Sequence, residues 1–143
     1  MSNHKEEEEF GTGLDQLSRV LAFVEGFLEK EGLQEGVFEI QLAVEEWYVN
    51  IVKHGFGGKD LGRVKLSLSF SQGSLEVQIR DNASAFDPHS LPSPEPPKSV
   101  EEAKIGGLGV HFIRNLMDTT SYRRVDGWNI FSMYKHFPAG DEQ

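Results

Sequence analysis

The hydrophobic residues of the first third of the chain follow a helical period. From Leu14 onward they are separated by alternating steps of three and four residues, at Leu14, Leu17, Leu21, Val24 and Leu28. This spacing predicts an amphipathic helix that ends near Gly32. A second helix is predicted from about Glu35 to Lys53, with Gly55 after its end.

Four later stretches alternate between apolar and polar residues, which is typical of strands with one buried face. The first two comprise residues 64–70 and 75–79, and the short turn 71–74 between them predicts an antiparallel hairpin. The other two comprise residues 120–125 and 128–136, and the hairpin-turn dipeptide Asp126-Gly127 joins them.

The segment between the two hairpins has a different character. Five of the six prolines lie between Pro88 and Pro97, so residues 89–105 are predicted to form a lid or binding loop instead of regular structure. The glycines of 106–109 then open a third helix that runs to about Met117. Residues 1–10, with four consecutive glutamates, predict a solvated and frayed tail, and residues 138–143 a second tail.

The order of these elements predicts the fold class. Hairpin-linked strands with helices in a separate layer indicate an α+β two-layer sandwich, in which helices cover one face of a mixed, mostly antiparallel sheet. A chain of 143 residues fits one domain of this kind, over residues 11–137.

Composition and charge narrow the range of functions. The net charge of −9 opposes binding to the phosphate backbone of nucleic acids. The absence of cysteine excludes disulfides, thiolate zinc sites and a cysteine nucleophile. No apolar run approaches the roughly 20 residues that cross a bilayer, and the N-terminus lacks the apolar core of a signal peptide. We therefore expect a cytoplasmic protein.

The second predicted helix carries the first candidate site. Glu46, Asn50 and His54 are spaced by four residues, so they form a polar stripe on a helix with apolar flanks. A carboxylate and a carboxamide in this arrangement suit a hydrated divalent cation and the removal of a proton. The alternative is a solvated helix face, with His54 near the helix C-terminus complementing the helix dipole.

Two further segments are candidates for binding. Asp81 ends a buried strand, where its carboxylate could accept a hydrogen bond from an exocyclic amine such as that of adenine; the alternative is ordinary turn chemistry. The glycines Gly106, Gly107 and Gly109 precede a helix, where backbone N–H groups could approach an anion. A flexible loop end is the alternative for these glycines, because no Walker sequence follows them.

The order and spacing of these three segments resemble the GHKL superfamily of ATP-binding domains, the Bergerat fold of gyrase and the histidine kinases. Within it they resemble the small anti-sigma-factor serine kinases typified by RsbW and SpoIIAB. Residues 42–55 look like the N box of that family, residues 81–88 like its first glycine box, and residues 106–113 like its second.

The resemblance implies roles for individual residues. Glu46 would be the general base for a protein serine, Asn50 would ligate Mg²⁺, and Asp81 would accept from the adenine amino group. It also implies ATP and Mg²⁺ as cofactors, and a sigma factor, an anti-anti-sigma (STAS-domain) protein and a second copy of the chain as partners. The remaining residues of the implied ATP site are His54, Ala83, Ala85, Phe86, Gly106, Gly107, Leu108, Gly109 and Val110.

Three positions depart from the family pattern. Ala83 and Ala85 stand where the first glycine box has glycine, and Trp128 and Asn129 follow Gly127 where a threonine is common. Each alanine methyl could clash with a bound base or could require strained backbone. These departures motivate an alternative function, a regulatory binding module of the same fold that binds nucleotide weakly and does not catalyse.

Overall fold

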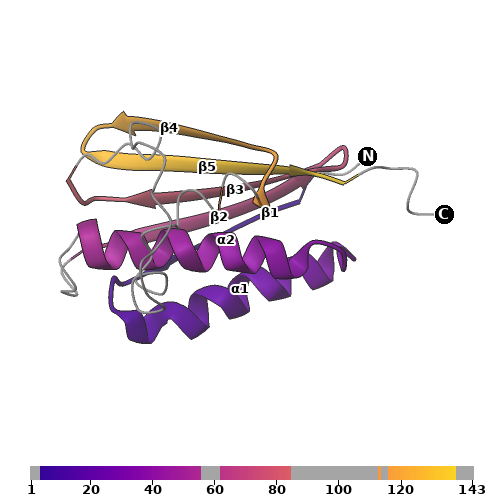
Figure 1. Cartoon of the computed structure of the whole chain (residues 1–143), viewed down its shortest axis with the longest axis horizontal. Coiled ribbons are helices and arrows are strands. Elements are labelled where there is room, and N and C mark those ends of the chain that lie inside the picture. The colour runs from indigo at the N-terminus through magenta and orange to yellow at the C-terminus, as the bar shows by residue number, and fades with distance from the viewer. Residues whose placement is uncertain (1–3, 56–61, 85–112, 114–115, 138–143) are drawn as a thin grey trace, which may run out of the picture.

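The computed structural model describes residues 4–55, 62–84, 113 and 116–137. A five-stranded sheet forms one layer, and helices α1 and α2 lie together against one of its faces as the second layer (Figure 1). The predicted two-layer α+β fold is therefore confirmed. None of the described helices is long and apolar enough to cross a membrane.

The predicted helices and strands appear close to their expected bounds. A 3₁₀ turn, Leu14–Gln16, leads into α1, and a π-helical turn, Ile51–Gly55, extends α2. The bounds of the main elements are β1 His4–Phe10, α1 Leu17–Lys30, α2 Val37–Asn50, β2 Val64–Ser71, β3 Ser74–Asp81, β4 Thr119–Val125 and β5 Trp128–His136.

The sheet order is β1-β2-β3-β5-β4, and all four pairings between the described strands are antiparallel. Both predicted hairpins form through two-residue turns. The central residues of each turn, Gln72-Gly73 and Asp126-Gly127, have positive φ angles, as the type I′ turn that suits the twist of a hairpin requires. The pairing of β3 with β5 joins the two hairpins, so the ends of β3 and β5 that carry Asp81 and Asn129 lie side by side.

The prediction that residues 1–10 form a frayed tail is wrong for the described residues, because His4–Phe10 forms β1 and pairs with β2 along its whole length. Alternate side chains of a strand point to opposite faces of the sheet. The four glutamates are thereby divided between two sets of basic partners, and each makes an ion pair: Glu6 with Lys30, Glu7 with Arg80, Glu8 with Arg19, and Glu9 with Arg63.

The end of β1 is fixed by burial. Phe10 is buried, its ring meets Phe23 of α1 edge-on at 6.1 Å, and the Arg19 guanidinium lies 5.0 Å from the Phe10 ring centroid. Surface ion pairs alone contribute little to stability, whereas burial of an aromatic side chain contributes several kcal/mol. Phe10 therefore anchors β1, although the run of charged residues in this segment predicts a solvated tail.

The core lies between the sheet and the two helices. Apolar residues of α1 and α2 face inward-pointing residues of β2, β3 and β5, and Trp47 of α2 stacks on Phe131 of β5 with ring centroids 4.2 Å apart. Ile113 and Met117, predicted to lie on one face of the third helix, are both buried in this core. A backbone hydrogen bond of 3.0 Å from Met117 to Ile113 has the i to i−4 spacing of an α-helix.

Candidate functional site

Helix α2 presents two of the predicted site residues on one face. Glu46 and Asn50 are one helical turn apart, and Glu46 is partly buried whereas Asn50 is only 6% exposed. The helix continues beyond Asn50 as the π-helical turn Ile51–Gly55. Single π-helical turns are rare and are frequent at functional sites, and this one directly follows the predicted metal ligand.

Asp81, the last residue of β3, provides the opposite side of the site. It is 2% exposed, and its Oδ1 accepts hydrogen bonds from the Ala83 backbone N–H (3.0 Å) and the Asn129 side-chain amide (2.9 Å). No described residue donates to the second oxygen, Oδ2. Within the described part of the chain, Asp81 Oδ1 is thus held by the protein and Oδ2 has no donor.

A small cavity lies between α2 and the ends of β3 and β5. Its volume is about 10 Å³, and its lining combines residues of all three elements: Trp47, Asn50, Ile51, Asp81, Ala83, Ser84 and Asn129. This is roughly the space of one water molecule, so a purine base needs its walls to move apart. The structure therefore brings Asn50 and Asp81 to one cavity.

The burial of both carboxylates changes their acidity. Loss of hydration raises the pKa of Asp81, and the hydrogen bonds from Asn129 and Ala83, with the charge of Arg124, partly oppose this rise. Burial also raises the pKa of Glu46, with a further contribution from neighbouring Glu45, while Lys53 acts in the opposite direction. A raised pKa suits a base only while the carboxylate remains ionised at the working pH.

Asn129 is a site residue that the sequence did not predict, because Asn129 was noted only as a departure from the threonine that is common after this glycine in the family. It is 2% exposed and pairs directly with Asp81 across β3 and β5. Its amide N–H₂ donates to Asp81 and to the Ser84 carbonyl (2.9 Å), and its oxygen accepts from Tyr122 (2.5 Å) and Arg124 (3.0 Å). An asparagine two residues after an Asp-Gly hairpin turn was the signal available in the sequence.

The backbone at Ala83 shows whether alanine is strained at this position of the first glycine box. Ala83 is buried, and it is not among the described residues with positive φ, which apart from glycines are Gln72 and Asp126. The alanine therefore stands there without left-handed strain. Its methyl still lies in the cavity wall.

The structure describes only a small part of the remaining predicted site. His54 lies in the π-helical turn, and nothing is described of its side chain. Outside the described residues lie Ala85, Phe86, the second glycine box with Gly106, Gly107, Leu108, Gly109 and Val110, and the predicted lid 89–105.

The residues present fit a magnesium ion that is bound mainly by its nucleotide. No cluster of three or more His, Asp or Glu side chains occurs in the described part of the chain, so a site built entirely from such ligands is not found there. Mg²⁺ usually keeps several waters and uses one or two protein ligands together with substrate phosphates. Asn50 supplies one side-chain oxygen at the cavity, and no described residue makes a hydrogen bond to its amide.

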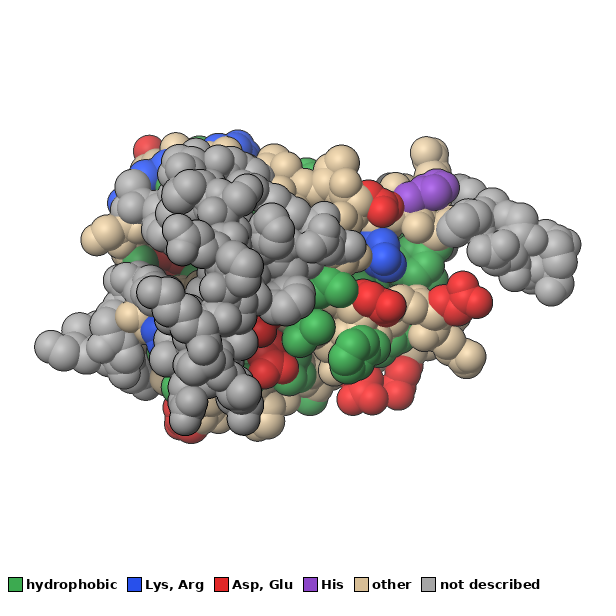
Figure 2. Space-filling model, viewed as in Figure 1, with side chains coloured by type: hydrophobic (Ala, Val, Ile, Leu, Met, Phe, Trp, Pro, Cys, Tyr) green, Lys and Arg blue, Asp and Glu red, His purple; other side chains and the backbone are tan. Residues whose placement is uncertain are grey.

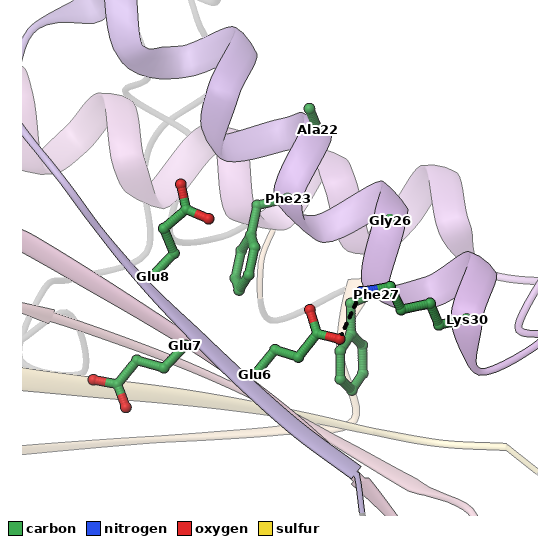
Figure 3. A pocket seen from close by; sticks show the side chains of 8 residues that line it. All are labelled: Glu6, Glu7, Glu8, Ala22, Phe23, Gly26, Phe27 and Lys30. Carbon is green, nitrogen blue, oxygen red and sulfur yellow. Dashed lines mark hydrogen bonds and ion pairs between the residues drawn. The ribbon is translucent and has the colours of Figure 1, made fainter.

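A larger cavity of about 520 Å³ lies between β1 and α1. Figure 3 shows Glu6 and Glu8 of β1 turned toward α1, where Lys30 pairs with Glu6, and Glu7 turned away. The carboxylates of Glu6 and Glu8 and the ammonium of Lys30 face this cavity, so its net negative charge repels the phosphates of a nucleotide. The small cavity is therefore the better candidate despite its size.

The described surface also carries the acidic balance of the sequence. On the face shown in Figure 2, acidic side chains are spread over the helical layer.

Comparisons with known proteins identify relatives of this arrangement. The family model of the histidine kinase-like ATPase domain matches residues 10–135. Serine/threonine-protein kinase BtrW of Bordetella bronchiseptica is 33% identical over 99 residues, which are 69% of this chain and 70% of that protein.

Two other relatives carry the name serine-protein kinase RsbW. That of Listeria monocytogenes is 33% identical over 100 residues, 67% of this chain and 64% of that protein. That of Bacillus licheniformis is 27% identical over 115 residues, 77% of this chain and 71% of that protein. The matched segments thus leave between about 29% and 36% of each relative uncovered.

Proposed function

Since the chain belongs to the family of histidine kinase-like ATPase domains, we propose that it is an ATP- and Mg²⁺-dependent protein-serine kinase that acts as a cytoplasmic anti-sigma factor. Its relatives named as serine kinases support the reaction class. The observation that carries the proposal is the meeting of Asn50 from α2 and Asp81 from β3 at one cavity.

In this proposal each described residue of the site has one role. Asp81 accepts a hydrogen bond from the adenine amino group through Oδ2, because Oδ1 already accepts from Asn129 and Ala83. Asn50 holds the magnesium ion, which neutralises phosphate charge when it is bound. Glu46, one turn before Asn50, accepts the proton of the substrate serine hydroxyl as that oxygen attacks the terminal phosphorus of ATP; the bond from this phosphorus to the bridging oxygen breaks and ADP leaves.

The proposed partners follow from the same relatives. We infer that the chain phosphorylates a serine of a STAS-domain anti-anti-sigma protein, sequesters a sigma factor and acts as a homodimer. The acidic surface supports docking on basic regions of a sigma factor, because complementary charge accelerates association.

A second candidate is a regulatory module that binds nucleotide weakly and does not transfer phosphate. The size of the cavity and the methyl of Ala83 in its wall favour this candidate. The presence of both Glu46 and Asn50 on α2 favours the kinase.

Calorimetric titration with Mg·ATP and with a non-hydrolysable analogue separates the two. The kinase proposal expects saturable binding that is lost without Mg²⁺, followed by transfer of labelled phosphate to a serine of a candidate STAS-domain protein. Absence of binding at millimolar nucleotide would remove the kinase and leave the module. Binding without transfer to any candidate partner would favour the module as well.

A further inference from the structure

The side-chain amide of Asn129 is saturated by the protein. An asparagine amide can make four hydrogen bonds, two as donor and two as acceptor. Its two donors reach Asp81 Oδ1 and the Ser84 carbonyl, both at 2.9 Å, and its oxygen accepts from the Tyr122 hydroxyl and Arg124 Nη1. Asn129 therefore has no hydrogen-bonding capacity left for a ligand.

The two donors from β4 also fix which way the amide faces. Arg124 and Tyr122 lie on the same face of the sheet as Asn129, since Arg124 pairs directly with Asn129 and Tyr122 lies two residues away. A guanidinium and a phenol that donate to one atom require an oxygen there, so the amide nitrogen must face Asp81. A flipped amide would place its oxygen against the carboxylate.

We propose that Asn129, fixed by Tyr122 and Arg124, is a positioning residue that holds Asp81 ionised in one orientation, so that Asp81 Oδ2 alone recognises the amino group of the base. The inference rests on the proposed function in taking the base to be adenine. It adds three residues, Tyr122, Arg124 and Asn129, which act on base specificity through Asp81.

The surroundings of Asp81 make its ionisation depend on this cluster. Helix α2 contributes Trp47 and Asn50 to the cavity, and the π-helical turn contributes Ile51; none of these residues carries a charge. Strand β4 brings the cation Arg124 to Asn129. Among the described residues, Arg124 is the charged group that lowers the pKa of Asp81, and Asn129 and Ala83 donate hydrogen bonds to its carboxylate. Loss of the Asn129 donor leaves a buried carboxylate that binds a proton more readily.

The test compares Asn129→Leu, which removes the donor with little change of volume, with the wild type. Binding of a fluorescent ATP analogue is measured over a pH series. If only ionised Asp81 binds the base, affinity falls about tenfold for each pH unit below the Asp81 pKa, and this fall begins at a higher pH in Asn129→Leu. The ATP preference over GTP also narrows at low pH in the variant. An equal loss at every pH would show a merely structural role and overturn the proposal.

A second variant covers the outcome in which Asn129→Leu does not fold. Tyr122→Phe removes one of the two donors that fix the amide, and we expect the same displacement of the pH profile in the same direction but smaller. Arg123→Gln is the matched control, because it removes one exposed arginine on the opposite face of β4. A profile that Tyr122→Phe leaves identical to that of Arg123→Gln would overturn the role of Tyr122 in fixing the amide.

A ligand-free measurement separates failure of this inference from failure of the proposed function. The carboxyl carbon of Asp81 is followed by NMR during a pH titration of the wild type, Tyr122→Phe and, where it folds, Asn129→Leu. Titration at higher pH in the variants supports the positioning role even if no nucleotide binds. Wild-type binding of ATP together with unchanged Asp81 titration in the variants would keep the kinase and reject the positioning role.

Discussion

The Tyr48 hydroxyl donates to the carbonyl oxygen of Gly11 at 2.8 Å, and it also lies 2.9 Å from the carbonyl oxygen of Gly13. These glycines follow β1, whereas Tyr48 stands in α2 between Glu46 and Asn50. The segment after the N-terminal strand is thereby tied to the helix that carries the proposed base. The strand that the sequence predicted as a tail is thus connected to the candidate site.

This contact gives a first prediction on stability. Tyr48→Phe removes the donor to the two carbonyl groups and should lower the free energy of unfolding by about 1–2 kcal/mol, measured by urea denaturation. Tyr134→Phe is a matched control, because the Tyr134 hydroxyl makes a longer contact of 3.4 Å with Glu76. Equal effects of the two substitutions would show that the Tyr48 contact is not a stabilising one.

A second prediction concerns β1 itself. Because β1 is an edge strand that pairs with β2 alone among the described strands, the amides that face β2 should exchange slowly with deuterium and the alternate amides rapidly. NMR-detected hydrogen exchange resolves the two sets. Phe10→Ala should abolish the protection, since it removes the buried anchor of the strand. Uniformly fast exchange over residues 4–10 of the wild type would show that these residues form a frayed tail instead of a strand.

The period of the hydrophobic residues was sufficient to predict α1, α2 and both hairpins, because these elements depend on contacts between neighbours in sequence. The strand β1 was missed because its stability comes from partners far along the chain. Glu7 pairs with Arg80 and Glu9 with Arg63. These partners are distant in sequence, so the sequence around the glutamates shows only a run of like charges.

The candidate site divides in the same way. The spacing of Glu46 and Asn50 is a local helical property and was visible in the sequence. The role of Asn129 depends on the pairing of β3 with β5 across 48 residues, and no local pattern specifies which strands become neighbours. The three family segments together implied one ATP site that includes Asp81, although they did not predict its partner Asn129.

A third prediction tests the proposed base. Glu46→Gln should keep binding of the ATP analogue and lower phosphotransfer by roughly 100-fold or more, the scale for loss of a general base. Rates are measured at saturating nucleotide with the STAS partner. Glu45→Gln removes the same charge from the adjacent residue and should retain activity at neutral pH. Unchanged activity of Glu46→Gln would remove Glu46 from the mechanism.

A fourth prediction concerns the pH dependence of the rate. Because the base must be ionised, activity should fall on the acidic side as Glu46 binds a proton, and burial places this fall above the ordinary pKa of 4.5. Lys53 stabilises the carboxylate, so Lys53→Met should move the fall to higher pH; Glu45 opposes ionisation, so Glu45→Gln should move it to lower pH. Displacement of both profiles in one direction would show that another group controls the rate.

The last prediction connects Asp81 to stability. The folded protein raises the pKa of Asp81 above its ordinary value of 3.8, so the folded state binds this proton more tightly than the unfolded chain does. By linkage, the contribution of Asp81 to stability is greatest at low pH, declines as the pH rises from 3.8 to the raised value, and is constant above it. Asp81→Asn keeps an oxygen that can accept from Asn129 but cannot ionise.

The free energy of unfolding of the wild type should therefore fall relative to that of Asp81→Asn as the pH rises through this window. The variant should also lose affinity for ATP. Urea denaturation at a series of pH values measures the difference, and Asp15→Asn, at an exposed residue, controls for removal of a surface charge. A difference that changes in favour of the wild type with rising pH would mean that folding stabilises the Asp81 carboxylate. In that case hydrogen bonds from Asn129 and Ala83 outweigh its loss of hydration, and the site is ionised at lower pH than its burial implies.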